Sequence, residues 1–103
     1  MDPSAGQRLS FRRSGGLFAG NVLATSVSVD DELAPLVAQA NLPELAVRSP
    51  IRGPGADVYQ YELALEGDGP PSRVVVQQTA VPEELRPLIE RLERRAEAER
   101  GRG

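Results

Sequence analysis

Neither histidine nor cysteine occurs among the 103 residues of the chain. Without cysteine there is no disulfide framework and no thiol chemistry. Without either residue the chain cannot build a Ser-His-Asp or Cys-His catalytic site, and it lacks the usual protein ligands of zinc. The 15 acidic residues leave a carboxylate-only reaction open, although most of them fall on faces expected to be solvated. We therefore expect a protein that is not an enzyme and that uses no cofactor.

Aromatic residues and long apolar runs are also scarce. Two Phe, two Tyr and no Trp are present, so aliphatic side chains must supply most of the core. No apolar run approaches the ~20 residues of a membrane span, and the N-terminus lacks the basic and apolar regions of a signal peptide. The net charge of −3 gives no support for nucleic-acid binding. We expect a cytoplasmic protein with neither a membrane nor a nucleic acid as partner.

Four segments have the patterns of β-strands. Residues 7–13 and 21–30 alternate apolar and polar side chains on either side of a glycine-rich turn, which predicts a β-hairpin. Residues 57–67 alternate in the same way, and residues 72–79 are rich in β-branched side chains. The turn GDGPP joins these last two segments. The pattern therefore predicts two hairpins.

Two further segments have helical periodicity. A short helix is expected to follow Asp30 and to end near Asn41 and Pro43. A longer one lies within residues 81–100, where Pro82 fits the first helical position. Pro87 either loosens the first turns of this helix or shifts its start to about Arg86. The apolar positions of the two are Leu33, Leu36, Val37 and Ala40, and Leu85, Leu88, Ile89, Leu92 and Ala96.

The predicted order of elements is ββαββα. This order indicates an α+β fold, a two-layer sandwich with a four-stranded antiparallel sheet and two helices on one face. Arg12 and Arg13 are interpreted as charges that protect a solvated strand edge, with contact to an acidic partner as the alternative. The length suits one domain, which we place at residues 7–97, between disordered termini at residues 1–6 and 98–103.

The glycine-rich turn SGGLFAG carries an unusual apolar pair, Leu17 and Phe18. This pair either folds back and caps the core or stands exposed for a partner. Asp57, just before the third predicted strand, has two interpretations as well. It either stabilises a turn or takes part in recognition.

Taken in order, several segments resemble one family. These segments are RSGGLFAG, LAPLVAQANLPEL, ADVYQYELAL and RVVVQQTAVPEELRPLIERL. They are similar to emfourin-type protein inhibitors of thermolysin-like metalloproteases, over roughly Arg8 to Leu92. The resemblance implies that the partner is a bacterial protease related to thermolysin or protealysin. It also implies two neighbouring flexible loops, one offering an aspartate to the protease's catalytic zinc and the other offering apolar side chains to its substrate pockets. The zinc belongs to the target, so the chain needs no metal site of its own.

The resemblance assigns protease binding to a small set of residues. The expected topology returns the loop from Arg48 to Asp57 to the side of the first turn. Asp57 is then the carboxylate that reaches the target's zinc, and Asp68 is the alternative if the loops are arranged otherwise. A non-inhibitory interaction module, using the open sheet face or the hairpin, is the competing hypothesis. The full set expected to bind the protease is Gly15, Gly16, Leu17, Phe18, Ala19, Ile51 and Asp57.

Overall fold

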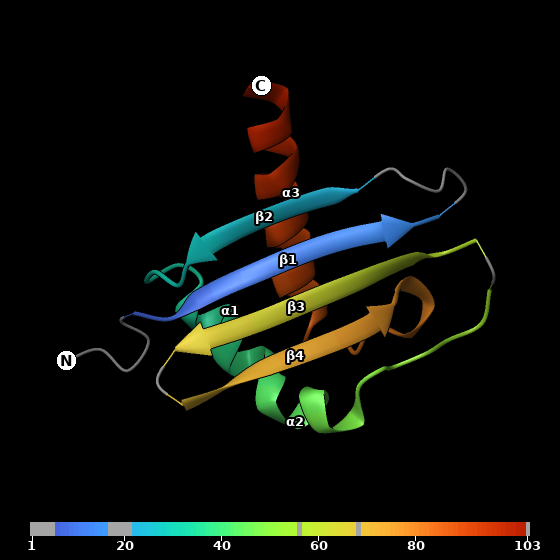
Figure 1. Ribbon diagram of the computed structural model, residues 1–103, viewed down its shortest axis with the longest axis horizontal. Helices are drawn as coiled ribbons and strands as arrows, with labels where there is room; N and C mark the ends of the chain where they lie inside the picture. Colours follow the sequence, from blue (N-terminus) through green and yellow to red (C-terminus); the bar gives the residue numbers. More distant parts are fainter. Residues whose placement is uncertain (1–5, 17–21, 56, 68, 103) are drawn as a thin grey trace.

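A computed structural model describes residues 6–16, 22–55, 57–67 and 69–102. Within these ranges four strands form one antiparallel sheet in the order β2-β1-β3-β4 (Figure 1). The strands are β1 (Arg8–Gly15), β2 (Leu23–Ser28), β3 (Tyr59–Gly67) and β4 (Gly69–Gln77). The α+β fold class and the ββαββα order predicted from the sequence are confirmed.

Each strand buries alternate side chains on one face of the sheet, as period-2 patterning requires. The buried residues of the strands are Leu9, Phe11, Leu23, Thr25, Val27, Tyr61, Leu63, Val74 and Val76. Their neighbours Arg8, Arg12 and Ser26 are exposed on the opposite face. The phenyl ring of Phe11 stacks on Tyr61, with 6.0 Å between the ring centroids.

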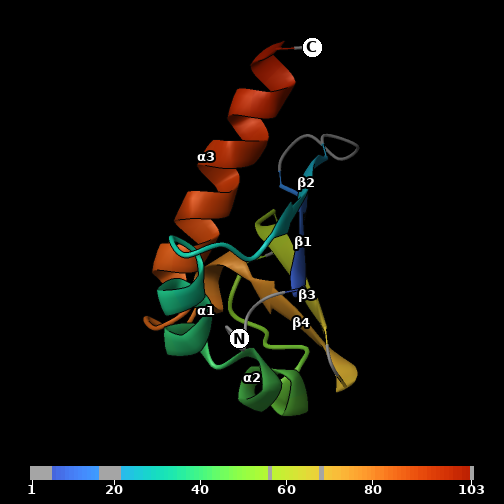
Figure 2. The same ribbon diagram turned by 90° about the vertical axis from the view of Figure 1, so that its left-hand side faces the viewer.

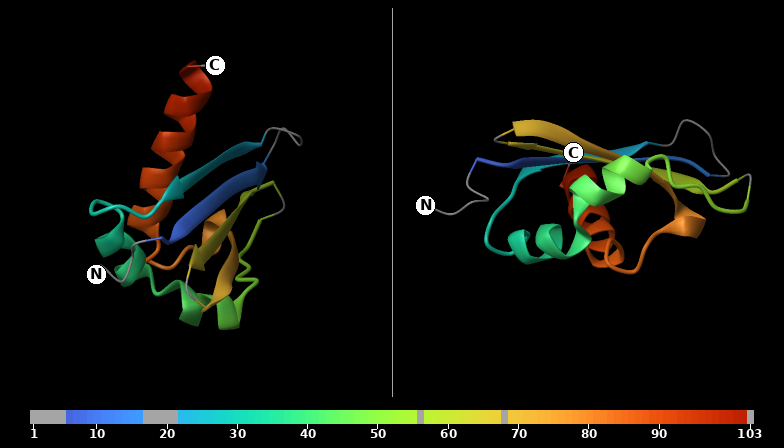
Figure 3. Two further views of the ribbon diagram at one scale, coloured as in Figure 1. Left: turned by 60° about the vertical axis from the view of Figure 1, so that its left-hand side comes forward. Right: turned by 90° about the horizontal axis from the view of Figure 1, so that it is seen from below.

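The helices cover the buried face of the sheet. They are α1 (Ala34–Ala40), α2 (Leu42–Arg48) and α3 (Arg86–Arg102), and a short 3-10 helix, η1 (Gln78–Ala80), follows β4. All three α-helices lie on the same side of the sheet (Figures 2 and 3). The apolar stripe that the sequence predicts on the last helix, from Leu85 to Ala96, is buried against the sheet. No helix of the described ranges covers the opposite face of the sheet.

Helix α2 was not predicted from the sequence, which placed the end of the first helix near Asn41 and Pro43. Asn41 has a left-handed backbone with φ of 51°, and its N–H donates to the Val37 carbonyl, which ends α1. Its own carbonyl accepts from the N–H groups of Glu44 and Leu45, so a new helix begins at once. Pro43 lies in the first turn, where a missing N–H leaves no bond unmade. Asn41 and Pro43, which we interpreted as the end of the first helix, therefore also form the start of the next one.

Helix α3 begins at Arg86, the later of the two starts expected from Pro82 and Pro87, and continues to Arg102. The sequence led us to expect the helix to end earlier, before a disordered terminus at 98–103. Its last turns are rich in alanine, glutamate and arginine, which favour helix. They are also tied to β2, because Thr25 Oγ1 donates to Glu99 and Arg100 donates to the carbonyl of Val22. In the ranges that the structure describes, no helix is long and apolar enough to cross a bilayer.

The strand order changes the interpretation of Arg13. Strand β1 is not an edge strand, because it lies between β2 and β3. Arg12 is exposed on the open face. Arg13 instead faces the helices, where its guanidinium lies 2.7 Å from the Glu93 carboxylate of α3. The interpretation of Arg12 and Arg13 as edge charges is therefore wrong, since a local pattern does not reveal which strands become neighbours.

Candidate functional site

The end of β1 and the start of β3 meet at one end of the sheet (Figure 1). Gly15 pairs with Tyr59 in the β1–β3 ladder, and the Gly16 N–H donates to the Val58 carbonyl at 3.2 Å. Asp57, next to Val58, is exposed. The base of the first turn and the base of the loop before β3 are thus joined through their backbones. The expected proximity of these two segments is confirmed for the residues that the structure describes.

Two glycines make this close approach possible. Gly15 and Gly16 have φ of +85° and +80°, a region that side chains disfavour. A Cβ added to Gly16 would lie 2.7 Å from Cε1 of Tyr59, and one added to Gly15 would lie 3.1 Å from the Val58 carbonyl oxygen. The base of the first turn therefore requires glycine both for its backbone conformation and for the space beside Tyr59.

The Tyr59 ring is held from the side of the helices. The Arg13 guanidinium lies 4.4 Å from the centre of this ring, a cation–π contact. The same guanidinium pairs with Glu93 at 2.7 Å. Its Nε is buried and has no hydrogen-bond partner among the residues that the structure describes. A continuous set of contacts therefore runs from α3 through Arg13 and Tyr59 to Gly16.

Tyr61 belongs to the same cluster of polar groups. Burial raises the pKa of its phenol, and the negative charge of Glu93 raises it further, while the charge of Arg13 acts in the opposite direction. The neutral phenol is therefore the form that this part of the core favours.

A substitution at Gly16 tests whether the Tyr59 ring is fixed. We expect Gly16→Ala to lower the free energy of unfolding by at least about 1 kcal/mol through its positive φ, and by about 1–3 kcal/mol more through overlap with the ring. Gly69→Ala is the matched control, because Gly69 also has a positive φ, and no described atom beyond its chain neighbours lies within 4 Å of an added Cβ. Urea unfolding measures both variants. Equal losses of unfolding free energy in Gly16→Ala and Gly69→Ala would mean that the Tyr59 ring moves aside freely.

The loop that ends at Asp57 is fastened to the chain after β4. Gly53 N–H donates to Gln77 Oε1 at 2.8 Å, and Thr79 Oγ1 donates to the Pro54 carbonyl at 2.7 Å. Gln78 Oε1 accepts from the Tyr59 N–H at 3.3 Å. Sequence reasoning missed these three side chains. The only signal was a polar run, QQT, directly after a β-branched strand.

The remaining predicted residues fall in different places. Leu17, Phe18 and Ala19 lie outside the described residues. Ile51 packs partly buried against the core, and its backbone bridges to Val76 of β4, so its side chain is not part of an exposed loop tip. Asp68 also lies outside the described ranges. Its neighbours Gly67 and Gly69 are at the far end of the nine-residue strand β3, about 25–30 Å from Tyr59.

The acidic residues of the described part do not form a metal site, since no group of three or more of them could hold an ion. Asp57 could therefore supply one carboxylate to a metal whose other ligands come from another molecule. It is the one acidic residue of the described chain that directly adjoins the joined loop bases.

Comparison with known families gives one result. A family model described as Emfourin matches residues 11–93. The match runs from Phe11 in β1 to Glu93 in α3, and it includes both loop bases. Comparisons with curated proteins and with solved structures found no significant match.

Proposed function

Because the chain belongs to the emfourin family, we propose that it inhibits a zinc metalloprotease related to thermolysin or protealysin. Family membership is consistent with a protease inhibitor rather than an enzyme, and it implies a protease as partner. The observation that carries the proposal is the backbone bond between Gly16 and Val58. This bond fixes the spacing of two loop bases, so that both loops can enter one cleft together.

In this proposal each loop has a separate task. Leu17 and Phe18 occupy apolar substrate pockets of the protease, which stabilises the complex by about 1.5–3 kcal/mol for each side chain buried. The Asp57 carboxylate binds the target's zinc at the position that a catalytic site keeps for water. Displacing that water removes the nucleophile. The backbone can approach the cleft closely at Gly15, Gly16 and Ala19, because their side chains are absent or small.

The sheet geometry supports Asp57 over Asp68 as the zinc ligand. Asp57 adjoins Val58, which is bonded to Gly16, whereas the neighbours of Asp68 lie at the other end of β3. One cleft cannot readily receive loops from both ends of the sheet. Ile51 is left out of the proposed contact surface, because it packs against the core.

The competing hypothesis of an interaction module on the open sheet face has no specific support. That face places residues of opposite charge across from one another, with Arg12 opposite Glu62 and Arg8 opposite Glu66. Such cross-strand arrangements are typical of a solvated surface. The cytoplasm stays the proposed location, on the sequence alone.

Hydrolysis of a quenched fluorescent peptide by thermolysin and by protealysin tests the function. We expect the protein, at micromolar concentration, to inhibit at least one of the two proteases in competition with the peptide substrate. Leu17→Ala and Phe18→Ala should each weaken inhibition about 10- to 100-fold without changing the melting temperature.

Val47→Ala is the matched control, because Val47 is an exposed apolar residue on α2, 86% accessible, and should leave inhibition unchanged. No inhibition of either protease at micromolar protein would refute the proposal. A lowered melting temperature with intact inhibition would show instead that Leu17 and Phe18 cap the core.

A further inference from the structure

The two outer edges of the sheet are protected very differently. At the β4 edge, the Ile51 N–H donates to the Val75 carbonyl at 2.8 Å, and the Ile51 carbonyl accepts from Gln77 at 2.9 Å. The Val75 N–H donates to Ser49 Oγ at 2.9 Å. Pro70 and Pro71, at the start of β4, have no N–H to offer. This edge is therefore closed to another strand.

The β2 edge has no such cover within the described part of the chain. The Val29 N–H donates to the Gln7 carbonyl at 3.0 Å, so the pair Gln7 and Val29 is a hydrogen-bonded one. Such pairs alternate along an antiparallel ladder. It follows that the backbone N–H and C=O groups of Ala24, Ser26 and Ser28 point away from β1.

The residues of β2 also lack the usual protection of an edge strand. The segment LATSVS contains no proline and no charged residue, the two features that most often prevent another strand from pairing. Arg100 covers the carbonyl of Val22, just before the strand. Beyond that point, the outward-pointing groups of Ala24, Ser26 and Ser28 form an open template.

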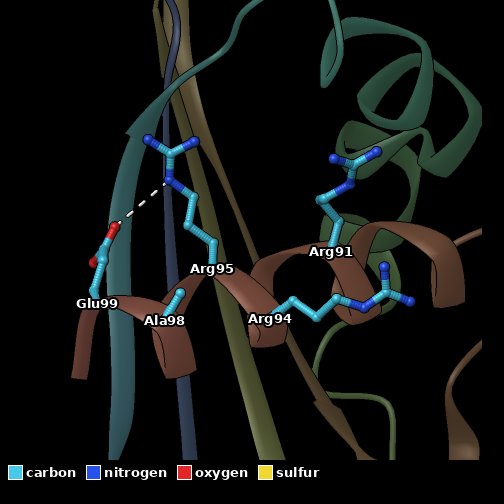
Figure 4. A pocket seen from close by; sticks show the side chains of 5 residues that line it. All are labelled: Arg91, Arg94, Arg95, Ala98 and Glu99. Atoms are coloured by element: carbon cyan, nitrogen blue, oxygen red, sulfur yellow. Dashed lines mark ion pairs between the residues drawn. The ribbon is translucent and has the colours of Figure 1, made fainter. Parts of the chain in front are cut away.

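A hollow lined by three arginines lies next to this edge, on the side of the helices (Figure 4). It is formed by Arg91, Arg94, Arg95, Ala98 and Glu99 of α3. Glu99 marks its nearness to β2, because Thr25 Oγ1 donates to this carboxylate at 2.9 Å. In Figure 4, Arg91 and Arg95 extend to the same side of the helix.

The charges in the hollow are available to a ligand. Arg91 lies 3.4 Å from Glu32 and Arg95 lies 3.5 Å from Glu99, with about half of each arginine side chain exposed. Exposed pairs of this kind contribute little to stability, so an added carboxylate can compete for them. Arg94 makes no ion pair with any residue that the structure describes. The hollow therefore has unused capacity for negative charge.

We propose that the β2 edge and this hollow together form a docking site for an extended, acidic segment of a partner protein. The segment adds a fifth strand by pairing with Ala24, Ser26 and Ser28. Alternate side chains of an added strand point to the helix side of the sheet, where acidic ones meet the arginines of α3. This site does not depend on the proposed inhibition.

A second copy of the chain is a poorer occupant of the same edge. If β2 paired with β2 of another molecule, the incoming strand would be LATSVS, which has no acidic side chain. The arginines of α3 would then gain nothing from the pairing. Charge complementarity therefore favours a separate acidic segment.

The probe for this site is a fluorescein-labelled heptapeptide, Thr-Glu-Val-Glu-Val-Glu-Thr. We expect saturable binding by fluorescence anisotropy at low salt, weakened as salt is added. Amide chemical shifts of Ala24, Ser26 and Ser28 should change on titration. The same peptide with Lys in place of Glu should bind at least about tenfold more weakly.

Variants separate the contributions of backbone and charge. Ser26→Pro removes an outward N–H without removing a bond to β1, and should weaken binding about tenfold. Ser26→Ala is its control, losing only the hydroxyl that accepts from Arg8. The triple variant R91A/R94A/R95A should also weaken binding about tenfold, whereas Arg86→Ala, an exposed arginine of α3 outside the hollow, should not.

Three results would overturn the proposal. The first is that the peptide shows no saturable binding. The second is that the amide chemical-shift changes are confined to the open sheet face. The third is that the chemical shifts of β2 change with protein concentration in the absence of peptide, which would indicate self-pairing. A melting curve checks that Ser26→Pro is folded. If it is not, a peptide N-methylated at alternate residues should lose binding to the wild-type protein for the same reason.

Discussion

Replacing Asp57 by asparagine should weaken inhibition of the target protease, thermolysin or protealysin, at least about hundredfold, with no change in melting temperature. Asparagine has nearly the same shape as aspartate but no charge, so it is a far poorer ligand for a zinc ion. A hundredfold loss corresponds to about 2.7 kcal/mol. Asp57 is exposed, and its replacement disturbs no packing. The inhibition constant of the purified variant measures the effect.

Asp31→Asn is the matched control for Asp57. Asp31 is also exposed, but it lies in the segment between β2 and α1, away from the joined loop bases. This variant should inhibit like the wild-type protein. If Asp57→Asn also inhibits fully while Asp68→Asn does not, the zinc ligand is Asp68 and the proposed arrangement of the loops is contradicted.

Replacing Glu93 by glutamine should lower the free energy of unfolding by about 2–4 kcal/mol. The change leaves the Arg13 guanidinium largely buried without its counter-charge, and breaking a buried pair from one side costs about 3–5 kcal/mol. The side chains of Arg13 and Glu93 keep 15% and 22% of their accessible surface, so water offsets part of that loss. Urea unfolding of Glu93→Gln and of the wild-type protein measures the difference in stability.

Glu97→Gln provides the comparison for Glu93. Glu97 lies 3.9 Å from the same guanidinium, but its side chain is 60% exposed. Its replacement should change stability by less than about 1 kcal/mol. If both substitutions lowered the free energy of unfolding equally, burial would not increase the contribution of the Arg13–Glu93 pair to stability.

The Glu93 variant also has a consequence at alkaline pH. Burial first, and the charge of Glu93 second, raise the pKa of Tyr61 above 10.0. The folded state therefore keeps this proton longer than the unfolded state, so the associated stability is present below pH 10 and is lost as the pH rises through the folded pKa. In Glu93→Gln the pKa of Tyr61 should fall, which an absorbance titration of the phenol detects. In Tyr61→Phe this alkaline loss should disappear.

Most of the fold follows from local patterns in the sequence. Alternation locates β1, β2 and β3 and their buried faces. The β-branched residues indicate β4, which begins at Gly69, within the expected GDGPP turn, and ends at Gln77. Pro87 indicates Arg86 as one of the two expected starts of α3. Two features were not predicted, namely the start of α2 and the role of Arg13. Both depend on the surroundings of a residue and not on its type alone. Pro43 ends a helix in one setting and begins one in another, and Asn41 does both at once through a left-handed backbone. The role of Arg13 depended on strand order, which is a property of the whole chain.

The candidate site was predictable in outline only. Residues around Gly16 and Asp57 were expected to be neighbours from the alternation of strand direction, and the described residues bear this out. The fastening of the second loop by Gln77 and Thr79 was not visible, because a side chain that bonds to a distant backbone leaves no periodic signal. Ile51 shows the same limit, since an isolated bridge to Val76 makes it structural within an otherwise irregular segment.

The bond between Gly16 and Val58 sets a limit on imitating this protein with short peptides. Gly15 and Tyr59 are ladder partners although they lie more than 40 positions apart in the sequence. The folded chain has already met the entropic cost of closing that long loop, whereas two separate peptides would meet it again on binding a target. A small mimic would need to connect the end of β1 directly to the start of β3, which makes a macrocycle of these two strand ends the smallest unit that preserves their spacing.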